Sequence, residues 1–600
     1  MNIQAALQSG LAALQRADFA GAEAQFSSVL KTNPTNADAL QLMGMVRKAQ
    51  NRLPEAERFL RQSLTAQPRQ PHVLNNLGNL IVATRRDDAA ILYERAIALS
   101  PRYPDAIANL AGIAFERGEL MVAKQQFLVA IALDANHVQS LLGLTALTKE
   151  QGLLAEAKSW AARAVLVVPN SLRAHSLTGD IASAANDFET AIMSYKKALN
   201  IGPASDALWA ALGGALRYAL RDQEAFEAFS TALELNPANI AAHRNFNALL
   251  WNYGRTDQYL DSYRATLPLV PNDEVVRIAF AEDLLRIGKV DEAQLLVDEI
   301  TAIDPLTVGL SQIKGRIEFA SGNFDAARVF FEHAIDEANS DCQTRVYQID
   351  SLLKAHRFDD AADSAQATLA LFPDDQDTLA RLMAANRLSG AADVFGLWNY
   401  DQFVKAIDLQ PPAGRNIADF NAELGDHLRT LHRTTNHPID QTLRGGTQTF
   451  GNLFALDKSA IVKSLVTMLE EAIAGYIADL PIWPDHPVSR RRGAGFKFDG
   501  SWSARLAANG FHTNHIHPKG WLSSAYYVAL PDQIKDQDRK AGWFKLGQTN
   551  MNLGEKDFAQ KLIEPKVGRL ILFPSYYWHG TTPFSDEAER LTIAFDVVPT

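Results

Sequence analysis

Over residues 1–375 the apolar positions follow the spacing of amphipathic helices, interrupted at regular intervals by short polar turns. An alanine recurs in steps of 34 residues, apart from one step of 33 and one double step in which Tyr259 stands in the alanine's place. The alanines are Ala22, Ala56, Ala89, Ala123, Ala157, Ala191, Ala225, Ala293, Ala327 and Ala361. Prolines keep the same interval between Pro34 and Pro373. This regularity predicts a repeat of two helices per unit.

Each marker has a physical role in such a unit. A small residue on the first helix, such as Gly44 or Gly78, lets the two helices approach closely, and the alanine marks their crossing on the second helix. Proline ends the second helix. The markers predict eleven units, from 3–36 to 342–375, and this region resembles tetratricopeptide repeat proteins. We therefore expect domain 1–375 to be an all-α superhelix in which each unit buries its apolar face against its neighbours.

The resemblance implies a partner. Tetratricopeptide arrays commonly bind peptides on the concave face that the first helices supply, so we expect a protein or peptide there. Asn76, Asn109 and Asn245 are candidates for gripping a peptide backbone, although exposed polar residues on any helix look the same. The aromatic repeat residues are expected in the core instead; they include Trp160, Trp209 and Phe229.

The pattern changes after Pro411-Pro-Ala-Gly414, which breaks the helical register. Segment 376–414 keeps helical periodicity without the alanine marker and is expected to be a capping helix pair and linker. Beyond it, 445–450 predicts a turn and a strand, and 458–480 predicts an amphipathic helix. Further short strands are expected at 495–498, 502–507, 524–530, 569–573 and 591–598. Domain 415–600 is therefore predicted to be a β-sandwich or barrel preceded by helices.

Three histidines in this domain have the layout of a mononuclear metal site. His515 and His517 are two residues apart, so on a strand their side chains project from one face. His579 follows the apolar strand 570–573. Neutral imidazole nitrogens are good donors to a shared ion. If the two strands come together, three ligands would leave part of the coordination sphere open.

Arg590 and Thr592 sit at the start of the last strand, on the same side. A guanidinium and a hydroxyl in this arrangement suit a carboxylate. Beside a metal, they point to a cosubstrate with two anionic ends, one bound to the ion and one to Arg590. The alternative is a surface ion pair of Arg590 with Glu587 or Glu589.

These segments resemble 2-oxoglutarate- and Fe(II)-dependent oxygenases related to prolyl 4-hydroxylases. The matching motifs are His-x-His-Pro, Leu-Ser-Ser-Ala-Tyr-Tyr-Val, Gly-Arg-Leu-Ile-Leu-Phe-Pro-Ser, Trp-His and Arg-Leu-Thr-Ile-Ala-Phe, with Gly-Gly-Thr-Gln-Thr upstream. The resemblance covers about residues 415–600 and implies a double-stranded β-helix (jelly-roll) with flanking helices. It also implies Fe(II) and 2-oxoglutarate as cofactors, molecular oxygen as cosubstrate, and hydroxylation of an unactivated C–H bond.

The sequence departs from that family at His517, which stands where the usual triad of ligands has a carboxylate. His515 and His579 are therefore the safer ligands, and Asp499, Asp532 or water are other candidates for the third position. His512 is expected in the cosubstrate pocket, together with one of Tyr526 and Tyr527, which alternate in direction. Surface or capping positions are expected for the remaining histidines of the domain, His427, His432, His437 and His486.

Composition narrows the setting. The net charge of −11 disfavours broad binding to nucleic acid or anionic membranes, and the basic run 490–492 is short. Cys342 is the only cysteine, which excludes an internal disulfide framework and fits a reducing compartment. No segment has the length and apolar character of a membrane span or targeting peptide. A cytoplasmic protein is expected.

Three functions follow as hypotheses. The first is a 2-oxoglutarate-dependent oxygenase that hydroxylates a protein or peptide side chain recruited by the repeats. The second is a repeat-based binding scaffold with a catalytically degenerate oxygenase-like domain, which the histidine at position 517 favours. The third is a non-oxidative cupin-type protein with zinc or nickel, but it leaves Arg590 and Thr592 without a purpose.

Overall fold

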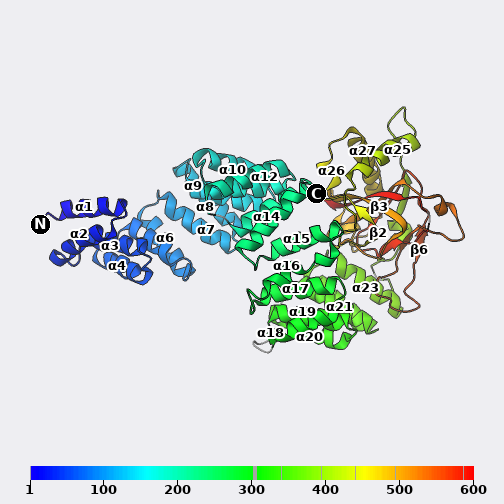
Figure 1. The fold of residues 1–600 in the computed structure, drawn as a ribbon, viewed down its shortest axis with the longest axis horizontal. Helices are drawn as coiled ribbons and strands as arrows, with labels where there is room; N and C mark the ends of the chain where they lie inside the picture. The colour runs from blue at the N-terminus through cyan, green and yellow to red at the C-terminus, as the bar shows by residue number, and fades with distance from the viewer. Residues whose placement is uncertain are drawn as a thin grey trace. The chain divides into compact units, whose positions relative to one another are not determined.

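The structure is a computed structural model that describes residues 2–203, 205–301, 307–338, 341–393, 395–439, 441–493, 495–585 and 587–600. The chain divides into two compact units, Met1–Ala215 and Leu216–Thr600. The expected tetratricopeptide superhelix followed by a β-rich domain is confirmed (Figure 1).

The first unit consists of helices that pair in the order of the chain. They are α1 (Ile3–Gln15), α2 (Phe19–Thr32), α3 (Ala37–Ala49), α4 (Leu53–Ala66), α5 (Pro71–Ile81), α6 (Arg86–Leu99), α7 (Pro104–Glu116), α8 (Leu120–Leu133), α9 (Val138–Glu150), α10 (Leu154–Val167), α11 (Leu172–Ala184), α12 (Phe188–Ile201) and the start of α13 (Asp206–Tyr218). The repeat alanines, such as Ala22 and Ala123, are fully buried. Each therefore lies in a helix contact, as their spacing predicts.

At Gly78 and Gly179 the small residue of the first helix faces an aromatic ring of the second. A Cβ added to Gly78 would lie 2.4 Å from the Tyr93 ring, and one added to Gly179 would lie 2.5 Å from the Tyr195 ring. Tyr195 is held in place because its hydroxyl donates to Asp180 at 2.9 Å. The glycine thus makes room for the ring that fills the space between the two helices.

The second unit continues the repeats and also contains the β-rich domain. Its repeat helices are α14 (Asp222–Leu235), α15 (Ile240–Asn252), α16 (Asp261–Thr266), α17 (Glu274–Arg286), α18 (Val290–Thr301), α19 (Val308–Ala320), α20 (Phe324–Ala338), α21 (Cys342–Lys354), α22 (Phe358–Leu371) and α23 (Gln376–Ser389). The repeat that lacks the alanine marker is irregular: a short 3-10 turn, η1 (Thr256–Gln258), precedes the six-residue α16. Tyr259 is buried there and is too bulky for the close crossing that alanine allows.

The capping helix pair expected within 376–414 is wrong in its second half. Helix α23 is regular and ends at Gly390, whose φ of 84° provides a left-handed cap. The chain then forms only a four-residue helix, α24 (Tyr400–Phe403), and the strand β1 (Lys405–Asp408). Strand β1 pairs with β7 (Arg569–Pro574), so this segment already belongs to the β-rich domain. Four residues are too few to show a strand period in the sequence.

Two antiparallel sheets form the β-rich domain in the described part of the chain. The six-stranded sheet has the order β1-β7-β4-β9-β3-β2, and the three-stranded sheet has the order β6-β5-β8. The remaining strands are β2 (Leu443–Gln448), β3 (Phe496–His512), β4 (Leu522–Ala529), β5 (Phe544–Leu546), β6 (Lys561–Ile563), β8 (His579–Thr581) and β9 (Arg590–Pro599). The segments expected at 495–498 and 502–507 form one long strand, β3, with a register shift between Phe498 and Gly500.

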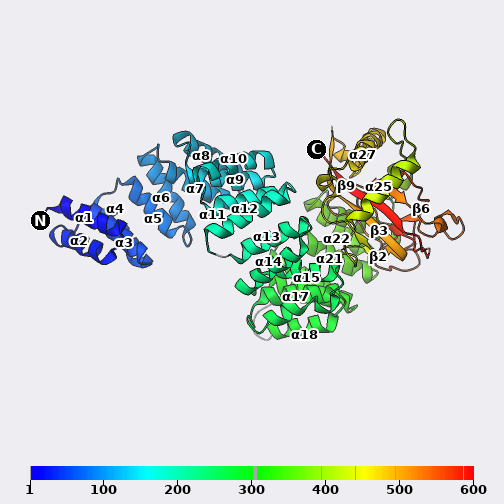
Figure 2. The same cartoon turned by 45° about the horizontal axis from the view of Figure 1, so that its top comes forward.

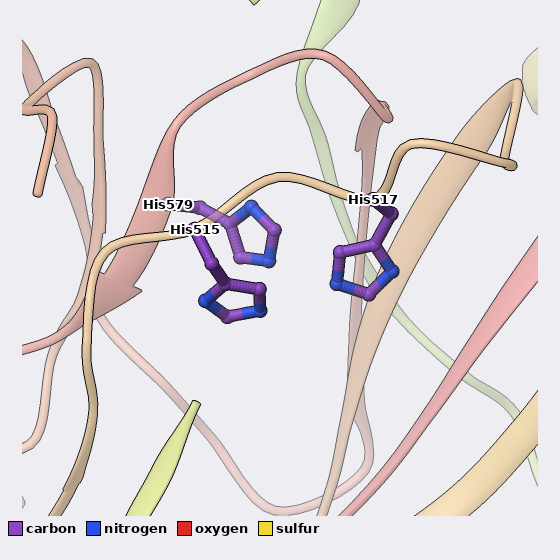
Figure 3. A group of neighbouring side chains, drawn as sticks. All are labelled: His515, His517 and His579. Carbon is purple, nitrogen blue, oxygen red and sulfur yellow. The ribbon is translucent and has the colours of Figure 1, made fainter. Parts of the chain in front are cut away.

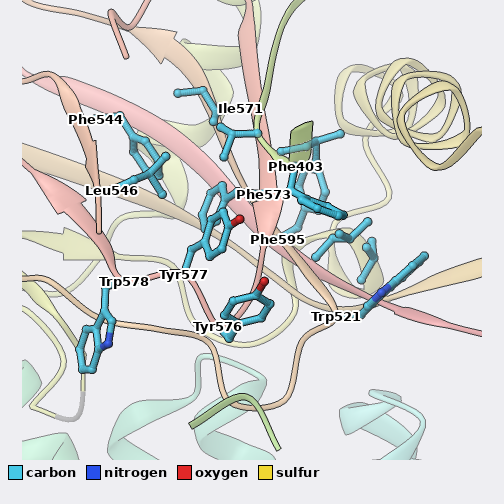
Figure 4. Close-up of a cluster of buried hydrophobic side chains, with 14 of the residues drawn as sticks. Phe403, Trp521, Phe544, Leu546, Ile571, Phe573, Tyr576, Tyr577, Trp578 and Phe595 are labelled. Atoms are coloured by element: carbon cyan, nitrogen blue, oxygen red, sulfur yellow. The ribbon is translucent and has the colours of Figure 1, made fainter. Parts of the chain in front are cut away.

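Helices cover both sides of this domain. Helices α25 (Ile417–Leu431) and α27 (Ala460–Asp479), with the short α26 (Leu453–Leu456), lie on one side, and the last repeat helices lie on the other (Figure 1; Figure 2). One hydrophobic core runs from α21–α23 into both sheets and includes Phe403, Trp521, Phe573 and Tyr576 (Figure 4). The final repeats and the sheets therefore fold as one body. Among the described residues, no helix combines the length and apolar character needed to cross a bilayer.

The surface position expected for His486 is wrong. His486 is 1 % exposed, and its ring stacks on Phe403 at a centroid distance of 3.8 Å. The Val488 N–H donates to its Nδ1 at 3.2 Å, and the Tyr576 hydroxyl lies 3.3 Å from its Nε2. His432 is also partly enclosed, between Thr447 and Ser503. Burial lowers the pKa of both histidines to about 4. Their partners come from distant segments that the sequence does not associate.

The glycine contacts in the repeats generate a matched pair of substitutions. Gly179→Ala should destabilise the protein by about 1–3 kcal/mol, because the added methyl group overlaps the Tyr195 ring. Gly112→Ala in α7 is the control, since nothing lies within 4 Å of its added Cβ; it should stabilise by roughly 0.5–1 kcal/mol. Urea unfolding followed by circular dichroism measures both, and equal midpoints for the two variants would contradict the packing described here.

The buried His486 makes stability depend on pH. Its pKa of about 4 in the folded protein lies below the unfolded value near 6.5, so the unfolded state binds a proton first as the pH falls. The contribution of His486 is complete above pH 6.5 and is lost towards pH 4, by roughly 3 kcal/mol. His486→Phe, which keeps a flat ring beside Phe403, should flatten this pH dependence in urea unfolding. A variant that loses stability as steeply as wild type between pH 6.5 and 4 would refute this role.

Candidate metal centre

His515 and His517 lie directly after β3, which ends at His512, and neither is part of a named strand. His515 forms an isolated antiparallel bridge with His579. The His515 N–H donates to the His579 carbonyl at 2.8 Å, and the reverse bond is 2.9 Å long. Ile516 packs against the core, so the two histidines on either side of it face the opposite way.

The three imidazoles converge (Figure 3). One ring nitrogen from each of His515, His517 and His579 can be chosen so that all three lie within 4.8 Å of one another. The ring centroids of His515 and His579 are 4.1 Å apart, and that of His517 is about 5 Å from each of them. Nitrogens about 2 Å from one ion are at most about 4 Å apart, so small ring rotations would complete a three-nitrogen face.

Hydrogen bonds define which nitrogen of each ring is available. His515 Nδ1 lies 2.8 Å from the Thr513 carbonyl oxygen, and His579 Nδ1 lies 2.9 Å from that of Tyr577. His517 Nδ1 lies 2.6 and 2.8 Å from the two carboxylate oxygens of Asp596. These oxygens can only accept, so each Nδ1 carries a proton and donates it. Each Nε2 is therefore the ring nitrogen left for a metal.

Burial favours the neutral form of His515 and His579. It lowers the pKa of His515 to about 3, with the neighbouring His517 as a second cause, and it lowers the pKa of His579 well below its usual value. Neither ring is charged at pH 7. Neutral imidazoles are metal ligands, whereas imidazolium rings are not.

Asp596 is the carboxylate that the sequence reasoning missed. It binds His517 Nδ1 and also accepts from the Ser523 hydroxyl at 2.6 Å. Of the two aspartates considered earlier, Asp499 lines the surrounding cavity, whereas Asp532 is exposed and pairs with Lys535. The signal for Asp596 was present: along β9, residues 590, 592, 594 and 596 alternate onto one face, and all four line the cavity.

Arg590 lies in the same cavity, which has a volume of about 400 Å³. It is 2 % exposed, its Nη1 donates to the Gly542 carbonyl oxygen at 2.6 Å, and it lies over the Tyr527 ring at 5.2 Å. The surface ion pair considered as an alternative is wrong, because Glu589 instead binds Arg429 and Arg505. Within the described ranges no carboxylate pairs with Arg590. A buried cation without a counter-ion is costly, so this cavity favours an anionic ligand.

The other residues expected at the pocket separate into two groups. His512 and Thr592 line the cavity. Tyr527 is opposite Thr592 in the sheet register and lies beneath Arg590. Tyr526 points away, because its hydroxyl donates to the Asn421 side chain of α25 at 2.9 Å. The expectation that only one of the two tyrosines is near the pocket therefore resolves to Tyr527.

Together these features suit a metal ion and a diacid. Three imidazole nitrogens converge in the cavity, and the same cavity holds Arg590, which pairs with no carboxylate among the described residues. The donor set consists of imidazole nitrogens, which bind iron, zinc, copper and nickel. The residues present thus fit Fe(II) and 2-oxoglutarate, although the donor set alone does not select iron.

Two protein families match different parts of the chain. Residues 500–596 match the family described as "Putative 2OG-Fe(II) oxygenase", and residues 13–80 match the family described as "Tetratricopeptide repeat". The chain thus carries tetratricopeptide repeats and an oxygenase-family domain that contains the three histidines, Arg590 and Asp596.

Similarity to individual proteins is partial. Cellulose synthase 1 operon protein C of Komagataeibacter xylinus is 27 % identical over 31 % of this chain and 15 % of its own length. Cellulose synthase operon protein C of Xanthomonas axonopodis pv. citri (strain 306) is 30 % identical over 26 % of this chain and 11 % of its own length. The chain therefore matches less than a fifth of either relative. TPR repeat-containing protein YpiA of Bacillus subtilis (strain 168) is 21 % identical over 52 % of this chain and 74 % of its own length.

Two solved structures also match part of this chain. A tetratricopeptide repeat protein from Parabacteroides merdae has a TM-score of 0.34 at 16 % identity, covering 42 % of this chain and 99 % of its own. Pseudomonas aeruginosa PilF has a TM-score of 0.31 at 22 % identity, covering 34 % of this chain and 93 % of its own.

Replacing the ligands should remove metal binding. We expect His515→Ala and His579→Ala to abolish stoichiometric binding of Co(II), used as an air-stable probe, in equilibrium dialysis of the full-length protein. Asp596→Asn should weaken binding by roughly 10- to 100-fold, because it weakens the acceptor that orients His517. His427→Ala, which alters a histidine bound to Asp457 away from the cavity, is the control. Unchanged Co(II) binding in His579→Ala would rule out this centre.

Proposed function

We propose that this protein is a 2-oxoglutarate- and Fe(II)-dependent oxygenase that hydroxylates a protein or peptide side chain recruited by its repeats. The observation that carries the proposal is one cavity that holds three convergent imidazole rings and a buried arginine, Arg590, for which the described part of the chain offers no carboxylate partner. The match of residues 500–596 to the oxygenase family supports the same chemistry.

The residues have distinct roles in this proposal. His515, His517 and His579 would hold the iron, leaving the rest of its coordination sphere open towards the cavity. When bound, Fe(II) and 2-oxoglutarate supply the oxidising chemistry, in which molecular oxygen is consumed, the 2-oxo acid is decarboxylated to succinate and a C–H bond is hydroxylated. Arg590 would pair with the carboxylate remote from the metal, and Thr592 would donate a further hydrogen bond.

Burial is the second contribution of the protein. His579, Arg590 and Thr592 are each less than a tenth exposed, so charge interactions in the cavity are only weakly screened. Phe544 and Phe573 contact the His579 ring, with centroids 5.7 and 4.6 Å away. An apolar wall beside the ligands excludes water from the place where the reaction would occur.

A second candidate function is a binding scaffold with an inactive oxygenase-like domain. His517 at the usual carboxylate position favours it, because a third neutral ligand gives the metal one negative charge fewer. The hydrogen bond from His517 to Asp596 argues for an active centre, since it places a carboxylate in direct contact with that ligand.

Turnover of 2-oxoglutarate separates the two functions. Full-length protein loaded anaerobically with Fe(II) should form succinate from 2-oxoglutarate when oxygen is admitted, even without a substrate. Arg590→Met should raise the KM for 2-oxoglutarate by roughly 100-fold while Co(II) binding stays intact, because it removes a buried charge partner. Arg539→Met, at an exposed arginine, is the control.

One result would reject the oxygenase function, and another would reject the role given to Arg590. One is the absence of succinate from protein that binds one metal ion per chain, which would favour the scaffold. The other is an unchanged KM for 2-oxoglutarate in Arg590→Met, which would remove this residue from the cosubstrate site.

A further inference from the structure

A second hollow adjoins the metal cavity within Leu216–Thr600. Its volume is about 310 Å³, and it lies between the ends of α13 and α15 on one side and the end of β2 on the other. Gln441, Gln448 and Trp502 line both hollows. These three side chains therefore separate the two neighbouring hollows. An extended ligand in the second hollow would reach the metal cavity past Trp502.

The inner wall of this hollow contains an unusual amide. Asn252, the last residue of α15, is 1 % exposed and lines the hollow. Neither its Nδ2 nor its Oδ1 has a hydrogen-bond partner among the described residues. Its main-chain oxygen, in contrast, accepts from the Thr435 and Asn436 N–H groups at 3.1 and 3.3 Å. A buried side-chain amide that lacks both partners matches a ligand that offers one donor and one acceptor, as a peptide group does.

The opposite wall is formed by Gln448, the last residue of the edge strand β2, and by the residues that follow it, up to Gly451. Strand β2 is the last strand of the six-stranded sheet and pairs only with β3 in the described part of the chain. Its other edge has no backbone pairing in those residues, and the hollow begins where β2 ends, at Gln448–Gly451. Exposed strand edges bind extended peptides through main-chain hydrogen bonds.

Flat side chains complete the hollow. Phe450 lies edge-on to Tyr218 at 6.5 Å, and the Arg217 guanidinium lies over the Phe450 ring at 4.6 Å. Together with Trp502 these rings form an aromatic wall beside Asn252 and the end of β2. The hollow thus combines an apolar wall with groups that recognise peptide backbone, which suits an extended polypeptide more than a compact metabolite.

This position refines the expectation that Asn245 grips a peptide. Asn245 is engaged within the protein, since its Oδ1 accepts from Arg217 at 2.8 Å and its Nδ2 donates to the Ala241 carbonyl oxygen at 2.9 Å. Asn252 lies on the same side of α15, about two helical turns further along. Asn109 is likewise bound to Asn75 and Asn79. The Asn252 amide, in contrast, has no partner among the described residues and lines the hollow.

We propose that this hollow is the subsite for the polypeptide substrate of the oxygenase: an extended segment lies against Asn252, the β2 edge and the aromatic wall. The side chain to be oxidised then enters the metal cavity past Trp502. This inference rests on the proposed function, because it assigns the place of that reaction's substrate. The repeats that recruit the substrate then also form one wall of the active-site entrance.

The test measures peptide binding without metal, so that its outcome is independent of succinate formation. Random twelve-residue peptides displayed on phage are selected on the full-length wild-type protein in the absence of Fe(II) and 2-oxoglutarate. The tightest peptides are synthesised with a fluorophore, and Kd is measured by anisotropy. We expect Asn252→Asp, which keeps the shape but removes the donor, and Tyr218→Ala, at a 41 % exposed position, each to weaken binding at least 10-fold.

Phe558→Ala is the matched control, because Phe558 is an exposed aromatic residue outside both hollows, and it should leave Kd within twofold. A photoreactive benzoylphenylalanine should crosslink the peptide from position 218 and not from position 558. Since Tyr218 is exposed, its replacement tests the subsite even if Asn252→Asp perturbs folding. Selected peptides that bind wild type and Tyr218→Ala equally, crosslinking from position 558 alone, or a library without binders would each overturn the proposal.

Discussion

Two backbone hydrogen bonds between His515 and His579 are the constraint on which the site depends. They join segments that are far apart in the chain, and the residues they join are themselves two of the three candidate ligands. His579 is also the first residue of β8, and there it pairs with Leu546 of β5. Because side chains alternate along extended backbone, a slip of one residue in this bridge would turn a ligand out of the cavity. The register of the smaller sheet thus also determines how the candidate ligands are placed.

The last repeats hold this region in place. The Trp578 side chain, next to His579, donates to the Ala380 carbonyl oxygen of α23 at 3.3 Å, and the Arg381 guanidinium lies over its ring at 5.2 Å. Arg381 in turn binds Asp350 and Asp377 from the repeats. The residue that precedes a ligand is therefore packed into the helical array. In this unit the final repeats therefore help to position the site, because they pack directly against Trp578.

Much of this fold could be predicted because its signals are periodic or local. The recurring alanines identify the repeats, since each marks a crossing that admits only a small side chain. The His-x-His motif and the final strand were visible for the same reason: alternation along extended backbone is a local rule. Features that depend on distant partners were missed. Strand β1 exists only because β7 lies beside it, and His486 is buried by Phe403 and Tyr576. Asn252 is notable only because it is unpaired next to a hollow, which no sequence pattern reveals.

The hydrogen bond between His517 and Asp596 bears on how a centre with three histidines can do the work of one with a carboxylate ligand. In the usual arrangement the carboxylate binds the metal directly and contributes a negative charge. Here the carboxylate lies 2.6 Å from the far nitrogen of the imidazole, so its charge acts through the ring. A carboxylate acceptor makes a ligating imidazole more basic and fixes its orientation. The Ser523 hydroxyl donates to Asp596, and these two residues lie on β4 and β9, the central strands of the larger sheet. A carboxylate charge is thus still present, but it contacts the imidazole of His517 and not the metal position. A histidine at position 517 does not by itself indicate a degenerate site.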